Sequence, residues 1–129
     1  MTTYDDPKTP EYVLKDLERL MLRIGANERW YDQTWLGAPI WQLPVDLIRL
    51  QNVVFDVKPH WIIETGTKFG GSAIFFSSLL RLMGLELGGV MTVDIELKDE
   101  AKQLFHDHPL GDLVRLAIEG DAASTTTAK

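Results

Sequence analysis

Residues 61–73 read Trp-Ile-Ile-Glu-Thr-Gly-Thr-Lys-Phe-Gly-Gly-Ser-Ala, a short apolar run that ends in an acid and then breaks into glycines. The β-branched pair Ile62 and Ile63, with a proline shortly before it, favours a buried strand over a helix. Gly66 then allows a sharp turn, and Gly70 and Gly71 leave room for another group beside the next helix. The stretch therefore predicts a strand, a tight turn and a helix N-terminus, where a ligand that accepts hydrogen bonds can bind.

The spacing of these glycines separates two kinds of nucleotide site. A dinucleotide fingerprint needs three glycines, and Lys68 stands where the middle one belongs. The spacing resembles more closely the pattern acid-x-Gly-x-x-x-Gly of methyltransferases that use S-adenosylmethionine, with Glu64 as the acid and Gly66 and Gly70 as the outer glycines. The alternative is an ordinary strand-to-helix turn whose glycines serve packing alone.

The sequence on either side of this stretch extends the resemblance over residues 30 to 124. The matching segments are Trp35–Ile40, Gln42–Asp46, Lys58–Pro59, Ile62–Thr67, Gly70–Ala73, Val93–Ile95 and Ile118–Asp121. They resemble the cephalosporin hydroxylase family, a group of Rossmann-type enzymes that depend on S-adenosyl-L-methionine and are related to sugar and antibiotic O-methyltransferases. The resemblance implies a cofactor site made by Glu64, Gly66, Thr67, Gly70, Ser72, Asp94 and Asp121, and it leaves the catalytic residues unknown.

Two of these acids follow later strands, and each has an alternative role. Asp94 ends the apolar run that starts at Val90, and an acid at the end of the second strand of a β-α-β unit accepts hydrogen bonds from ribose hydroxyls. The alternative for Asp94 is to cap the next helix. Asp121 follows the third strand, where the resemblance places groups near an adenine ring. It either accepts from the adenine amino group or closes a turn.

Composition and charge exclude several classes of protein. The 129 residues carry a formal net charge of −6 with scattered lysines and arginines, which excludes a surface built for nucleic acid or anionic membranes. No cysteine is present, and His106 and His108 are not spaced to bind a metal. No signal peptide and no membrane-spanning run is visible. We therefore expect a cytoplasmic protein.

Hydrophobic periodicity predicts the other elements. A first helix has Thr9 as its cap and Pro10 in its first turn and ends at Gly25, and its apolar stripe is expected to pack on the domain. Residues 27–43 read as a loop with three tryptophans as anchors; the resemblance places this loop near the cofactor, and simple packing is the alternative. The elements expected next are a helix from Pro44 that ends before Lys58, a helix Ser72–Met83, a strand Val90–Val93, a helix Glu96–His106 and a strand Val114–Ile118.

The predicted fold is α/β. It is a three-layer, Rossmann-like parallel sheet of the methyltransferase type, with strand order 3-2-1, helices on both faces and further helices before the first strand. We expect one partial domain over residues 1–129, with loose tails at 1–8 and 122–129, and a chain truncated relative to its family.

The expected function is binding of S-adenosyl-L-methionine by a methyltransferase-like protein that acts on a hydroxyl acceptor. The resemblance places acidic metal ligands, for a divalent ion such as magnesium, after fourth and fifth strands that this chain lacks. We therefore expect no metal site here and no turnover by the chain alone. The alternatives are a non-catalytic nucleotide-binding module and an inert structural remnant. An apolar first strand at the sheet edge further predicts a homo-oligomer.

Overall fold

The structure is a computed structural model that describes residues 10–27 and 30–124. It divides into two units, residues 1–30 and 31–129, and each is described by itself. The predicted cap Thr9 and most of both predicted tails lie outside the described residues. None of the described helices is long and apolar enough to cross a membrane.

The first unit contains helix α1 (Glu11–Asn27), which extends two residues past the predicted end at Gly25. Its apolar side chains recur at helical spacing, yet none of its residues is buried. Leu17 and Leu20, for example, are 55% and 53% exposed. What this stripe packs against stays a prediction.

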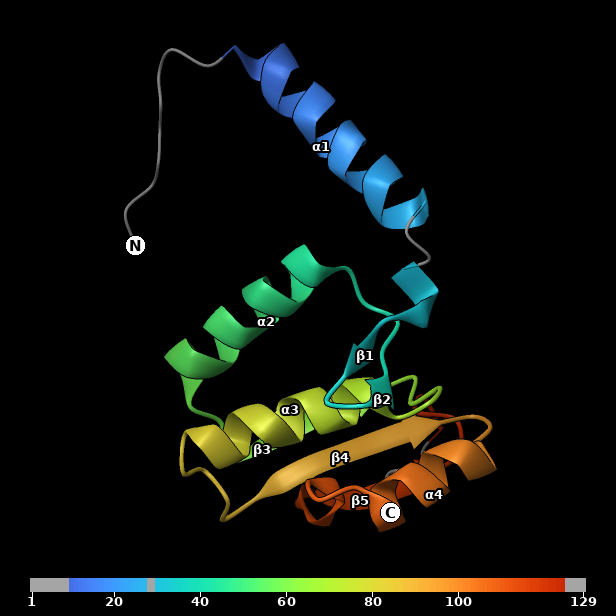
Figure 1. Cartoon of the computed structure of the whole chain (residues 1–129). Coiled ribbons are helices and arrows are strands. Elements are labelled where there is room, and N and C mark those ends of the chain that lie inside the picture. The colour runs from blue at the N-terminus through green and yellow to red at the C-terminus, as the bar shows by residue number, and fades with distance from the viewer. Residues whose placement is uncertain (1–9, 28–29, 125–129) are drawn as a thin grey trace. The chain divides into compact units, whose positions relative to one another are not determined.

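The second unit is an α/β fold around a parallel sheet (Figure 1). The elements in chain order are η1 (Trp30–Asp32), β1 (Thr34–Trp35), β2 (Ala38–Pro39), α2 (Pro44–Val57), β3 (Trp61–Thr65), α3 (Gly71–Leu82), β4 (Gly89–Asp94), α4 (Asp99–Asp107), η2 (Gly111–Leu113) and β5 (Val114–Glu119). The main sheet runs β3-β4-β5 with both pairs parallel. The α/β class and the parallel three-stranded sheet of a Rossmann-like fold are therefore confirmed.

The segment predicted as a loop contains a small hairpin. Strands β1 and β2 pair antiparallel through a two-residue turn, in which Leu36 and Gly37 both have positive φ angles of 49° and 86°. Such a turn matches the twist of the flanking strands. The indole N–H of Trp35 donates to Ser78 Oγ at 2.9 Å, and this bond ties the hairpin to α3.

Helices α3 and α4 lie on the same face of the sheet (Figure 1), where Phe105 of α4 joins a core cluster with Ala73 and Leu80 of α3 and Val90 of β4. Helix α2 packs on α3 through Leu47 and Val54, rather than mainly on the sheet. The predicted three layers are not confirmed in this unit. Both crossovers run in the same direction, and right-handed crossovers then place consecutive helices on one face.

The opposite face of the sheet corrects the expectation of a fully buried first strand. Side chains alternate along a strand, so Trp61 and Ile63 point away from α3. They are 47% and 66% exposed, and Leu116, level with Ile63 across the sheet, is 44% exposed. The apolar run was read as burial on both faces, but helices cover only one face of β3. Strand β4 between its neighbours is largely buried, as expected.

Candidate functional site

The carboxyl ends of the three parallel strands bring the predicted acids together. The register places Thr65 beside Val93 and Asp94 beside Glu119. Two backbone bonds continue the ladder past the strands, from Gly66 N to Val93 O and from Gly120 N to Asp94 O, both 2.8 Å. The turn after β3, Asp94 and the segment after β5 therefore form one edge, which is where open α/β sheets bind ligands.

Asp94 is held ionised by backbone donors. Its Oδ2 accepts from the N–H of Lys68 at 2.9 Å, and its Oδ1 accepts from the N–H of Glu96 at 3.3 Å. These bonds, the Lys68 bond foremost, lower the pKa of Asp94 below its ordinary value. The carboxylate is therefore fixed beside the glycine turn as an acceptor. It does not cap α4, which begins five residues later at Asp99.

Glu64 is a carboxyl of a different kind. Burial raises its pKa, and hydrogen bonds with Ser72 and Thr92 offset this only in part. Its Oε1 is shielded from water and has no hydrogen-bond partner among the described residues. Glu64 therefore places behind the turn a carboxyl whose charged form is disfavoured by burial.

The predicted glycines serve different purposes. Gly66 has a φ of +87° and faces open space, because a Cβ there would meet nothing within 4 Å. Gly70 has a φ of +85° and lies against Phe105, whose ring would be 2.6 Å from a Cβ. At Gly71 a Cβ would lie 2.6 Å from the carbonyl carbon of Pro39. The room that a side chain would need at Gly70 and Gly71 is thus taken by α4 and β2, and of the three only Gly66 has open space where a Cβ would be.

The remaining predicted residues are placed as follows. Thr67 is 2% exposed and its hydroxyl bonds to that of Thr92 at 2.6 Å, so only its main chain is available to a ligand. Ser72 lies in the first turn of α3 and is half-buried. The carboxylate of Asp121 accepts a hydrogen bond from the N–H of Ala123 at 2.9 Å and so closes a turn. This is one of the two roles that the sequence left open for Asp121.

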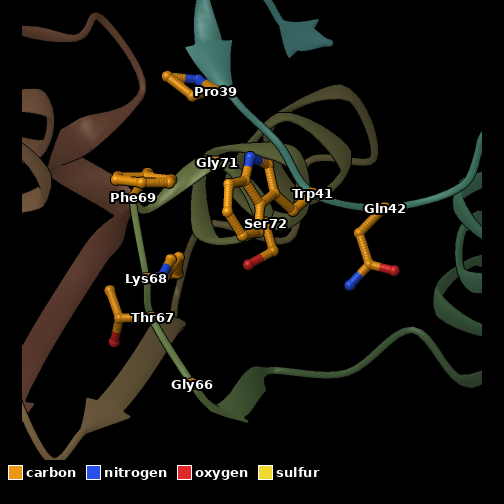
Figure 2. A pocket seen from close by; sticks show the side chains of 9 residues that line it. All are labelled: Pro39, Trp41, Gln42, Gly66, Thr67, Lys68, Phe69, Gly71 and Ser72. Carbon is orange, nitrogen blue, oxygen red and sulfur yellow. The ribbon is translucent and has the colours of Figure 1, made fainter. Parts of the chain in front are cut away.

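A small pocket of about 70 Å³ lies beside the glycine turn (Figure 2). Its walls are Pro39, Trp41, Gln42, Gly66, Thr67, Lys68, Phe69, Gly71 and Ser72. Neither Asp94 nor Asp121 is among them. Small-molecule sites usually measure about 300–1,000 Å³, so this pocket holds only part of a ligand.

Three residues at this edge were not among the predicted site residues, although the resemblance placed the tryptophan-rich segment near the cofactor. Trp41 comes from the tryptophan-rich segment and packs edge-on against Phe69 with ring centroids 5.4 Å apart. Lys68 extends its ammonium over both rings. Ile95 follows Asp94 directly and is 78% exposed, which is unusual for a large apolar side chain after a buried strand. The apolar residue after the acid was a signal that the sequence offered.

A comparison with protein families matches residues 27–129 to the family described as rhamnosyl O-methyltransferase/CmcI. The chain belongs to this family. The sequence itself resembles the cephalosporin hydroxylase family. That family is related to the matched family but is not the same one. Among curated proteins, the chain is similar to a rhamnosyl O-methyltransferase of Mycobacterium leprae, 34% identical over 74 residues, which are 57% of this chain and 32% of that protein. It is equally similar to one of Mycobacterium tuberculosis (strain ATCC 25618 / H37Rv), 34% over 69 residues, 54% and 28% respectively.

The match covers about a third of the length of these relatives. No solved structure matches the chain significantly. Membership of an O-methyltransferase family favours the methyltransferase interpretation over a generic nucleotide module or an inert remnant.

Proposed function

We propose that this chain binds S-adenosyl-L-methionine at the carboxyl ends of β3, β4 and β5, as the cofactor-binding part of an O-methyltransferase. The observation that carries the proposal is the pairing of Asp94 with the glycine turn. Its carboxylate accepts the Lys68 N–H at 2.9 Å, directly across from the open Gly66, in a chain of an O-methyltransferase family.

The residues at this edge fit an adenosyl group. Asp94 has lone pairs left for the two ribose hydroxyls, since an ionised carboxylate offers about four acceptor sites. Ile95 is exposed beside it and offers an apolar surface to the adenine ring. Asp121 lies on the neighbouring segment, where its carboxylate would face the adenine amino group. Gly66 allows the ligand to approach the backbone without meeting a side chain.

Two features of the site favour this cofactor over a dinucleotide. Lys68 stands where a dinucleotide fingerprint has its middle glycine, and backbone donors lower the pKa of Asp94, which favours its ionised form. A carboxylate beside the turn repels a pyrophosphate, whereas the sulfonium of S-adenosylmethionine is a cation. Thr67 and Ser72 would add main-chain and hydroxyl contacts beside Gly70.

When bound, S-adenosylmethionine supplies an electrophilic methyl group. The residues of this chain would hold and orient it, and transfer further needs an acceptor hydroxyl in line with the methyl. The matched relatives are named for a rhamnosyl acceptor, and we propose a sugar hydroxyl as the acceptor class here. The described residues contain no group of three or more His, Asp or Glu side chains that would hold a metal ion. That this chain alone does not transfer methyl groups, and that longer relatives bind magnesium, stay predictions.

We also propose that the protein is a cytoplasmic homo-oligomer, in which a second copy covers the edge of β3. That strand lies at one side of the sheet, and its outward Trp61 and Ile63 are about half exposed. Exposed strand edges with apolar side chains promote pairing between chains. If the second copy also covered the exposed face of the sheet, it would supply the missing third layer.

Calorimetric titration of the protein with S-adenosylmethionine, S-adenosylhomocysteine and NADH tests the proposed function. We expect both adenosyl ligands to bind and NADH to bind far more weakly, because Lys68 replaces the middle glycine of a dinucleotide site and the carboxylate of Asp94 repels a pyrophosphate. Binding of NADH alone, or of none of the three, would contradict the proposal.

A further inference from the structure

Lys68 is the residue by which the glycine turn departs from a dinucleotide fingerprint, and its backbone is fixed in place. Its φ of +49° lies in the left-handed region that side chains rarely adopt. Its N–H donates to Asp94, the carboxylate proposed for the ribose. Because the backbone of Lys68 is fixed, its side chain leaves the turn in one direction. A glycine at this position would have no side chain to place there.

The side chain of Lys68 lines the pocket beside Trp41 and Phe69 (Figure 2). Its Nζ lies 4.9 Å from the ring centroid of Trp41 and 5.3 Å from that of Phe69. The two rings pack edge to face, and the indole N–H of Trp41 donates to Tyr31 O at 2.9 Å, which fixes the ring. Two aromatic faces attract an ammonium and hold it over the pocket.

This ammonium keeps unused hydrogen-bonding capacity. Aromatic faces attract it electrostatically but accept none of its three N–H donors as an oxygen would. No ion pair joins the Lys68 ammonium to a carboxylate in the described part of the chain, although the backbone N–H of Lys68 bonds to Asp94. Of the described residues that line the pocket, Lys68 alone carries a charge. The pocket therefore presents a held cation with free donors.

We propose that Lys68 binds the carboxylate at the amino-acid end of the adenosyl ligand. This assignment rests on the proposed function, in which Asp94 holds the ribose. The pocket is separate from the proposed ribose position, because neither Asp94 nor Asp121 lines it. Its volume of about 70 Å³ suits a small polar group and not an adenine ring. A ligand with adenosine at Asp94 would extend its charged tail toward Trp41 and Lys68.

The test compares two ligands that differ in this tail. S-adenosylhomocysteine carries the carboxylate, and 5′-methylthioadenosine has the same adenosyl group without the amino-acid part. Both are titrated by calorimetry into the wild type, Lys68→Met, Lys68→Arg and the control Lys58→Met. Lys58 has the same left-handed backbone, with φ of +50°, but caps α2 away from the pocket. The control therefore matches the lost charge and the backbone strain.

We expect Lys68→Met to weaken S-adenosylhomocysteine about tenfold, the effect of roughly 1.4 kcal/mol, and to leave 5′-methylthioadenosine unchanged. Lys68→Arg should retain most of the affinity, and Lys58→Met all of it. Equal weakening of both ligands in Lys68→Met, or of neither, would overturn the assignment while leaving the proposed function intact. Failure of both ligands to bind the wild type would overturn the proposed function and the assignment with it.

A parallel titration with adenosine 5′-monophosphate separates the carboxylate from a phosphate. If Lys68 serves the carboxylate, Lys68→Met leaves the affinity for this nucleotide unchanged. A loss confined to the nucleotide would identify the bound oxyanion as a phosphate and contradict the assignment.

Discussion

Replacing Gly71 by alanine tests whether the β1–β2 hairpin lies on α3 as the structure has it. Gly71 is the first residue of α3, and its φ is not in the left-handed region. By helix propensity alone, alanine there should stabilise the protein, by up to about 1 kcal/mol. The structure predicts the opposite sign.

A Cβ at position 71 would lie 2.6 Å from the carbonyl carbon of Pro39 and 2.9 Å from Cα of Ile40, and closer still to the Pro39 oxygen. These are backbone atoms, so no rotamer change relieves the contact. The hairpin must shift by roughly 1 Å, which disturbs the buried Ile40 and its packing with Phe75. Overpacking of this kind costs about 1–3 kcal/mol, which exceeds the gain in propensity.

Urea unfolding followed by tryptophan fluorescence and by circular dichroism measures the difference. We expect Gly71→Ala to lose about 1–2 kcal/mol net. Gly84→Ala is the control, because Gly84 has a φ of +67° and open space, so backbone strain acts there without a clash. A Gly71→Ala protein at least as stable as the wild type would refute the placement of β2, and with it one wall of the pocket.

Three other predictions concern the glycine turn and the sheet. Gly66→Val should abolish adenosyl-ligand binding, because a β-branched side chain resists a φ of +87° and would occupy the space open to the ligand; normal affinity by calorimetry would mean that the ligand does not lie against Gly66. Glu64 has a pKa raised by burial, so the folded state keeps its proton to higher pH than the unfolded state and stability falls as pH rises from the ordinary value through the raised one. Glu64→Gln should flatten this fall in thermal melts between pH 4 and 8, and an unchanged slope would contradict the burial of this carboxyl. Light scattering at micromolar concentration should show a dimer or larger species formed through β3, and Ile63→Lys should shift it toward monomer; a wild-type monomer that melts cooperatively would oppose self-association.

The sequence predicted the elements well where one physical signal dominated. Pro44 fixed the start of α2, and the residue before Pro59 ended it, with Lys58 in a left-handed cap. The run of apolar residues between the glycine turn and Gly84 predicted a helix buried on most sides, and eight of its residues are buried. Asp94 was placed at the end of β4 by its position after an apolar run.

Other features depend on contacts between distant segments, which no local pattern encodes. Gly70 and Gly71 looked like space for a ligand, but Phe105 and Pro39 fill that space from elsewhere in the chain. The hairpin turn was missed because Leu36 is an uncommon residue at a positive φ. Alternation in β3 was hidden because both of its faces are apolar, so the exposure of Ile63 followed only from where the helices lie.

The central claim is that Asp94 holds the ribose of an adenosyl ligand, and one titration tests it most directly. S-adenosylhomocysteine is titrated by calorimetry into the wild type, Asp94→Ala and the control Asp112→Ala, whose carboxylate pairs with Arg81 away from this edge. Circular dichroism confirms that each variant is folded. We predict that Asp94→Ala loses about 1.5–3 kcal/mol of binding free energy, the range for a hydrogen bond to a charged group, and that Asp112→Ala loses none. Equal affinity of the wild type and a folded Asp94→Ala protein would contradict the account.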